Sequence, residues 1–255
     1  MKKNSKRKKQ DLPELLAVSK KERHLLYIKS ICVVLVLDYF FYQSFAALVP
    51  LSYIGYKFFL MEEKHLKDKK REEAKEQFKE MLILVSNSQR AGYSAENAFL
   101  TSYPEMKELY GENSEICKML RMIRTAKENK KSLAEVWYVI GERTKIQEIT
   151  EFSKVYDISR QKSGNVAGVM EKTAEIIVDK IVTEKEITIM LSAKRLEQRI
   201  MNVMPFFIMF YITITSPGYF ADLYHGPEGV LIMSICMVVY LAAYSASMKI
   251  VDIKI

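Results

Sequence analysis

The chain of 255 residues carries 39 basic and 31 acidic side chains, a formal net charge of +8, and has a mean hydropathy of −0.07. Nine glycines, six prolines and three cysteines exclude a collagen-like, a low-complexity and a disulfide-stapled chain. The charges are unevenly distributed, because residues 25–61 and 200–248 together hold only two basic and three acidic side chains. This segregation excludes a single soluble globule and predicts membrane segments.

The first apolar segment follows a basic N-terminal segment, residues 1–24, which has nine basic and three acidic residues. Residues 25–61 are too many for one span of about 20 residues, so we expect a hairpin of two transmembrane helices that turns at Gln43 and Ser44. A cleaved signal peptide has a much shorter apolar region, so we expect this segment to be retained. Asp38 lies within the first span, where an ionisable residue is either functional or close enough to the outer interface to be solvated.

The second apolar segment, residues 200–248, also predicts a transmembrane hairpin, with a Gly- and Pro-rich connector at 217–229. Neither this connector nor the first turn contains Lys or Arg, whereas residues 62–199 contain 26 and the tail 249–255 contains two. The positive-inside rule therefore places both termini and the middle segment in the cytoplasm. Basic clusters beside membrane spans indicate topology and contact with anionic lipids, and we expect no nucleic-acid partner.

The middle segment, residues 62–199, has helical periodicity throughout and no alternating strand pattern. We expect its first helix over 68–90 and a turn at 91–94, followed by a short helix that Ser94 caps. We expect a break at Pro104 and then a helix to about Glu128.

Two capping-box patterns predict the starts of the next helices: Ser132 with Glu135, and Thr144 with Gln147. A turn at 163–165 precedes a long helix over 166–199 that leads into the third span. These elements predict a cytoplasmic bundle of about six helices, within an all-α integral membrane protein of four transmembrane helices.

Motifs for common chemistry are missing from the sequence. The three histidines are far apart, and the cysteines at 32, 117 and 236 form no C-x-x-C pair, so we expect buried apolar thiols and no metal site. The chain has no phosphate-binding loop and no nucleophile elbow. We therefore expect no catalytic residue and no cofactor, and any ATP that its task consumes must be hydrolysed by another subunit.

Several segments taken together resemble the type II secretion F family, and within it the platform proteins of Tad (tight adherence) pili. The segment FKEMLILVSNSQRAGYSAENAF resembles the family's helix, R-A-G-x-S turn and following short helix, and QKSGNVAGVMEKTAEII resembles the element before its long helix. KKSLAEVWYVIGERT and LSAKRLEQRIMNVMPFF resemble two further family segments. The matching positions, which the resemblance marks as hinge or interaction candidates, are Arg90, Ala91, Gly92, Ser94, Ala98, Gly164, Asn165, Glu171 and Pro205.

The resemblance implies a non-enzymatic, multi-pass platform protein of a bacterial or archaeal cytoplasmic membrane. Its implied partners are a secretion ATPase, a second platform protein of the same family or a second copy, and a pilin or pseudopilin. Two alternatives remain open from the residues: a membrane-anchored helical adaptor or signalling scaffold, and a membrane enzyme or transporter that uses Asp38.

Overall fold

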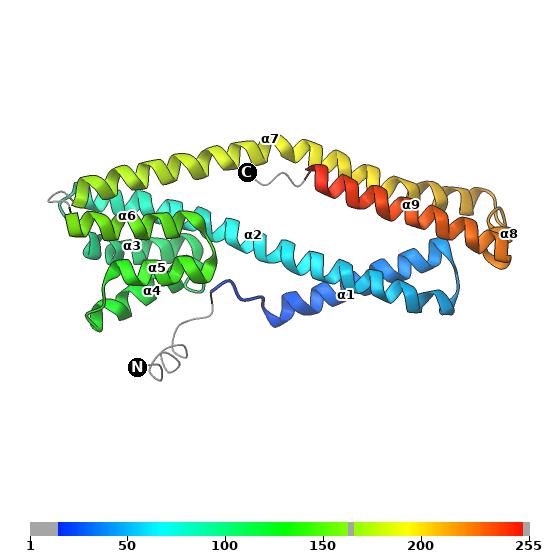
Figure 1. Ribbon diagram of the computed structural model, residues 1–255, viewed down its shortest axis with the longest axis horizontal. Coiled ribbons are helices and arrows are strands. Elements are labelled where there is room, and N and C mark those ends of the chain that lie inside the picture. The colour runs from blue at the N-terminus through cyan, green and yellow to red at the C-terminus, as the bar shows by residue number, and fades with distance from the viewer. Residues whose placement is uncertain (1–14, 163–165, 252–255) are drawn as a thin grey trace. The chain divides into compact units, whose positions relative to one another are not determined.

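The computed structural model describes residues 15–162 and 166–251, and every regular element in these ranges is helical (Figure 1). This confirms the expected all-α fold. The chain divides into two compact units: residues 1–18 with 66–183, called the bundle unit here, and residues 19–65 with 184–255, called the apolar unit. Two helices, α2 (Leu48–Arg90) and α7 (Val166–Thr215), contribute to both units.

The bundle unit contains the second part of α2 and the first part of α7. Between them in the chain lie α3 (Ala95–Tyr110), α4 (Glu115–Glu128), α5 (Leu133–Thr144) and α6 (Gln147–Lys162). From α3 to α6, each helix contacts the next and is joined to it by a short turn, as is usual in helical bundles.

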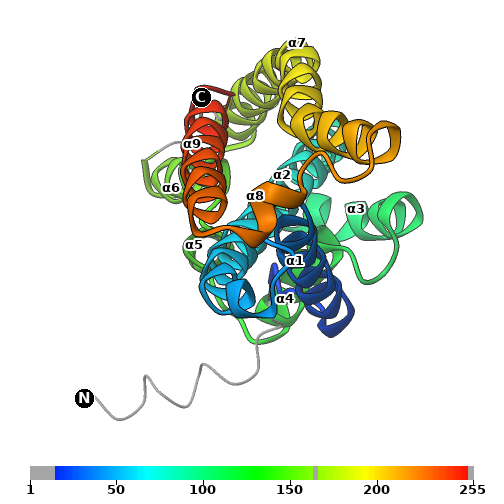
Figure 2. The same cartoon turned by 90° about the vertical axis from the view of Figure 1, so that its right-hand side faces the viewer.

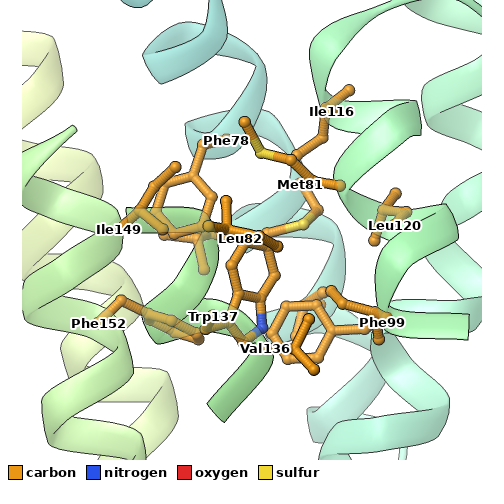
Figure 3. Packing of buried hydrophobic residues seen from close by; sticks show 14 of the residues in the cluster. Phe78, Met81, Leu82, Phe99, Ile116, Leu120, Val136, Trp137, Ile149 and Phe152 are labelled. Atoms are coloured by element: carbon orange, nitrogen blue, oxygen red, sulfur yellow. The ribbon is translucent and has the colours of Figure 1, made fainter. Parts of the chain in front are cut away.

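Aromatic side chains fill the centre of the bundle unit (Figure 3). Trp137 of α5 is fully buried, and its ring centre lies 5.4 Å from that of Phe78, 5.3 Å from Phe99 and 5.7 Å from Phe152. These rings come from four different helices, and most of the pairs meet edge to face, which is a favoured geometry for aromatic contacts. The cluster therefore fixes how α2, α3, α5 and α6 pack together.

The first turn of the bundle unit matches the sequence prediction, whereas the position of the next break does not. Gly92 follows α2 with φ of +92°, and Ser94 is the N-cap of α3. Pro104 does not end α3 but lies inside it, and the break comes at Gly111, whose φ is +81°. A proline costs a helix one N–H donor but has helical φ, whereas the left-handed φ at residue 111 is one that glycine adopts readily.

Both predicted capping boxes are wrong in detail. Ser132 is the N-cap residue of α5, but its Oγ is buried and has no hydrogen-bond partner among the described residues. Thr144 is the last residue of α5 and not the residue directly before α6; its hydroxyl donates to the carbonyl of Ile140 and accepts from the N–H of Ile146 at 3.4 Å. Lys145 then takes a left-handed φ of 56° and ends α5 in the way that a glycine would.

The apolar unit contains α1 (Lys20–Phe41), the 3₁₀ turn η2 (Phe45–Ala47), α8 (Ala221–His225), α9 (Pro227–Val251) and the apolar parts of α2 and α7. Figure 2 views this unit from the end at which α8 lies. A small core joins its helices, made of Leu37, Phe41, Leu51, Met233 and Met237. Tyrosine hydroxyls add links: that of Tyr224 donates to the carbonyl of Phe40, and that of Tyr240 to the carbonyl of Asn202.

Large apolar side chains cover the outside of the apolar unit. Phe207 is 64% exposed, Val238 is 65% exposed and Ile31 is 59% exposed. The helices α1 and α9 are long and apolar enough to cross a membrane. The apolar parts of α2 and α7, residues 48–61 and 200–215, are shorter than a span of about 20 residues. By length and composition, the described residues thus contain two candidate spans.

The helices α2 and α7 correct one sequence expectation and confirm another. We expected a separate helix starting near Asp68, but α2 is unbroken from Leu48 to Arg90. The long helix over 166–199 does continue into the third apolar segment, because α7 extends to Thr215 with Pro205 in its interior.

Candidate functional site

The candidate residues that the structure describes gather mainly where α2 ends and α3 begins. Arg90 is the last residue of α2, and its Nε donates to Oε1 of Glu171, in the second turn of α7. The Arg90 side chain is 64% exposed and that of Glu171 is 37% exposed. Two residues that are 81 positions apart in the chain, both marked by the sequence resemblance, thus form an ion pair at the surface of the bundle unit.

The turn between α2 and α3 is closed by its own backbone. The N–H of Gly92 donates to the carbonyl of Gln89 at 2.9 Å, and the N–H of Tyr93 donates to that of Ser88 at 3.1 Å. A Cβ added to Gly92 would have no heavy atom within 4 Å, so the glycine is needed for its φ and not for space. The turn therefore sets the direction of α3 without help from neighbouring side chains.

The start of α3 anchors the turn to the aromatic core. The Ser94 hydroxyl accepts from the N–H of Asn97 at 3.4 Å, which satisfies one free donor of the first turn. Ala98, one turn further on, is fully buried in the same cluster as Trp137, whereas Ala91 in the turn is exposed. The cap at Ser94 and the buried Ala98 thus hold the start of α3 beside the core.

A second ion pair attaches α7 to the bundle, and sequence reasoning missed it. Nζ of Lys180 lies 3.0 Å from Oε1 of Glu148 and 3.6 Å from Oε2 of Glu151, both on α6. The Glu148 side chain is only 7% exposed, so its carboxylate is nearly buried and needs this partner. Since Lys180 lies 32 positions after Glu148 in the chain, no local pattern could have predicted the pair.

The remaining candidates lie apart from this corner. Pro205 is inside α7 in the apolar unit, and Gly164 and Asn165 fall outside the described residues. Asp38 lies near the end of α1, and its Oδ1 is buried without a hydrogen-bond partner among the described residues. It borders a shallow, open hollow formed by the end of α1 and the following turn, with Tyr39 and Phe45 among its other lining residues.

The three cysteines differ in their surroundings. Cys117 is buried in the core of the bundle unit as expected, but Cys32 and Cys236 are exposed on α1 and α9, which corrects the expectation of three buried thiols. Both lie on helices whose outer surfaces are apolar, where a thiol behaves as a small apolar group. Among the described residues, no group of three or more His, Cys, Asp and Glu side chains is placed to hold a metal ion.

Shifted titrations in the bundle unit arise from ion pairing and burial. The hydrogen bond and charge of Lys107 lower the pKa of Glu112, and the same contact raises the pKa of Lys107. Burial, with a smaller contribution from the charge of Glu96, raises the pKa of Tyr156. Lys107 and Glu112 are exposed and Tyr156 is part of the core, so these shifts follow from helix packing and surface pairing.

The fold and the site thus define an all-helical protein that has a charged helical bundle, two helices able to cross a membrane, and an ion-paired corner at the end of α2. Comparison of the chain with models of known protein families, with curated proteins and with solved structures found no match.

Proposed function

We propose that the chain is a platform protein of a type IV-like pilus or type II secretion apparatus in a bacterial or archaeal cytoplasmic membrane. In this role it is not an enzyme. It couples a separate cytoplasmic secretion ATPase to the assembly of pilin or pseudopilin subunits, and it works with a second platform protein of the type II secretion F family or with a second copy of itself.

The observation that carries the proposal is the continuity of α2 and α7. Each is one unbroken helix that has an apolar segment at one end and a charged, bundle-forming segment at the other. A helix resists bending because successive turns are hydrogen-bonded to one another, and α7 keeps this pattern from the bundle as far as Pro205, which lacks an N–H donor and lies within the apolar segment. Force applied to the bundle segment is therefore carried along the backbone into the apolar segment. A protein that only tethers a domain to a membrane needs no helix that is continuous between the two.

The arrangement at the start of α7 also supports coupling. The ion pairs at Glu171 and Lys180 hold the first part of α7 on the bundle, and the buried face between them consists of Ala174 and Ile177. Movement of the bundle therefore displaces α7 directly. This supports the platform more than the adaptor alternative, in which nothing would select for contacts that hold one helix at two points.

The proposed topology has four spans, with both termini and the bundle in the cytoplasm. The two shorter apolar segments, in α2 and α7, would cross the membrane with little tilt, and the charged residues that flank them would lie at the lipid headgroups. A reporter fused after His225 should then behave as extracytoplasmic, and one fused after Gly111 as cytoplasmic. A cytoplasmic signal after His225 would contradict the four-span topology.

The function itself is tested by removing the chain from its cell and restoring it. Loss of the chain should abolish surface filaments or pseudopilus-dependent secretion while pilin accumulates unassembled in the membrane, and restoration should reverse both effects. The restored chain should co-purify with the secretion ATPase from solubilised membranes. Unchanged filaments and unchanged secretion in cells without the chain would refute the platform, and co-purification with a signalling protein in place of the ATPase would favour the adaptor.

A further inference from the structure

The solvent face of α4 and the residues that follow it carry an excess of positive charge. Residues 121–131 contain five basic side chains and one acidic side chain. Of these, Arg124, Lys127, Lys130 and Lys131 are all exposed, and together they are called the basic corner here. The opposite face of α4 is buried in the core, so these charges are confined to the outside of the bundle unit.

Ion pairing distinguishes this face from the other charged face of the bundle unit. On α2, residues 66–90 have seven basic and five acidic side chains, and the cations at 69, 75 and 79 pair with a carboxylate three or four positions away. In the basic corner, Arg124 lies 3.6 Å from Glu128, and Lys127 donates to an uncharged amide. The positive charge is therefore largely uncompensated by carboxylates within the corner.

The basic corner lies beside the turn that the sequence marked. Nζ of Lys127 donates to Oδ1 of Asn97 at 2.7 Å, which places the end of α4 next to the first turn of α3. The preceding turn residue, Tyr93, is 52% exposed. Tyr93 lies four positions before Asn97, and an exposed tyrosine is typical of protein-binding surfaces, where aromatic and charged groups act together.

Helix geometry alone does not account for the whole basic corner. Cations in the last turn of a helix are favoured by its dipole, which explains Lys127. The dipole effect falls off within one turn, so it does not explain Arg124, which is earlier in α4. Lys130 has a φ of 54°, a conformation that glycine or asparagine adopts more readily, so a lysine at this position carries a conformational cost.

We propose that the basic corner is the docking surface for an acidic face of a partner protein. The inference rests on the proposed function, because that partner is the secretion ATPase which the platform requires. Charge complementarity supplies the affinity and speeds encounter, and Tyr93 adds a contact with an apolar ring.

A protein partner fits the corner better than lipid headgroups. The bundle unit begins on α2 at Leu66, and Arg90, which precedes the turn at the corner, is about 36 Å further along the helix at 1.5 Å per residue. Lipid headgroups at the apolar end of α2 would contact the basic residues nearest to that end, such as Lys64 and Lys67, before those of the basic corner.

The test measures binding between the full-length chain in nonionic detergent and the purified secretion ATPase of the same cell. The corner variant combines Arg124→Glu, Lys130→Glu and Lys131→Glu, which leaves the contact between Lys127 and Asn97 in place. The matched control combines Lys69→Glu, Arg143→Glu and Lys154→Glu, three exposed cations elsewhere on the bundle unit, so that the change in net charge is the same. Thermal unfolding followed by circular dichroism checks that both variants remain folded, and a corner variant with Gln in place of Glu serves if charge reversal prevents folding.

We expect the corner variant to weaken binding at least tenfold and the control less than threefold, with wild-type binding falling as NaCl rises from about 0.05 to about 0.5 M. Equal weakening by the two variants would overturn the docking surface while leaving the platform function intact. If the chain binds the ATPase only when anionic lipid vesicles are added, and the corner variant loses binding to the vesicles themselves, the basic corner binds lipid and the inference is wrong. Failure of the wild-type chain to bind the ATPase would contradict the platform function, and the inference would fail with it.

Discussion

A single proline placed in α7 should separate assembly of the fold from transmission of force. Thr188 is exposed, and its hydroxyl donates to the carbonyl of Glu184 at 2.9 Å within the helix. Thr188→Pro removes one backbone donor and pushes the ring against the preceding turn, which costs about 3 kcal/mol and introduces a kink. No buried side chain is lost, so a domain of ordinary stability, about 5–15 kcal/mol, remains folded.

The expected result is a chain that accumulates normally in the membrane but does not support filaments. Thr188→Ala is the matched control, because it removes the same hydroxyl without a kink and should leave filaments at the wild-type level. The assay counts surface filaments and measures the amount of chain in the same membranes. The intrinsic fluorescence of Trp137, the only tryptophan, reports whether the bundle core is intact.

The result that would refute the reasoning is a normal filament count for Thr188→Pro at normal abundance. A rigid α7 would then be unnecessary, and the proposed function would lose the observation on which it rests. Loss of filaments in the Thr188→Ala control as well would indicate instead that this surface of α7 binds a partner.

Three further predictions concern the bundle unit. Gly141→Ala should lower the free energy of unfolding by about 1–3 kcal/mol despite the higher helix propensity of alanine, because the new Cβ would lie 3.0 Å from backbone atoms of α6; a raised melting temperature would contradict this. Gly92→Ala and Gly111→Ala should each lower the free energy of unfolding by about 1–2 kcal/mol, because both glycines have a positive φ. Only Gly92→Ala should reduce the number of filaments at equal abundance of the chain. Equal filament counts for the two variants would exclude a hinge at the turn between α2 and α3. Lys107→Met should raise the pKa of Glu112 towards its ordinary value in an NMR titration, because the substitution removes the hydrogen bond and the positive charge that lower this pKa. The stabilisation from the pair is present above the ordinary pKa of glutamate and is lost as the pH falls through the lowered pKa of Glu112. An unchanged titration would show that the ion pair does not form in solution.

The local features of the fold were predictable because their causes are local. Gly92 and Ser94 sit in a short stretch whose conformational preferences point to a turn and a cap, and the structure confirms both. The sequence prediction missed the break at Gly111, because it placed the end of the helix at Pro104. Proline inside a helix is tolerated where the surrounding packing stabilises the element, and Ser102 and Met106, two positions before and after Pro104, are both buried.

The contacts that build the corner could not be predicted, since each joins residues far apart in the chain. Arg90 and Glu171 were both singled out by their positions in motifs, but nothing in the sequence indicated that one would bind the other. Lys180 and Glu148 were not singled out, because a charged residue on a helix is usually solvated. Only the packing of α7 on α6 places the carboxylate where water is excluded.

The two long-range ion pairs explain why α7 behaves as part of the bundle over one stretch and not beyond it. Glu171 and Lys180 are nine residues apart, about two and a half turns, so the pairs hold the helix at both ends of its buried face. Beyond them, the last buried apolar residue of α7 is Ile181, and Ile189 and Met190 are exposed. An exposed pair such as that of Arg90 contributes at most about 1 kcal/mol, whereas breaking the nearly buried pair of Glu148 costs more. The two ion pairs are therefore uneven: the exposed pair at Glu171 breaks at little cost, whereas the pair at Lys180 is nearly buried, and Met170 and Ala174 keep the start of α7 in the core. A partner bound near the end of α2 can therefore replace the Arg90–Glu171 pair without disturbing the buried contacts that hold α7 on the bundle.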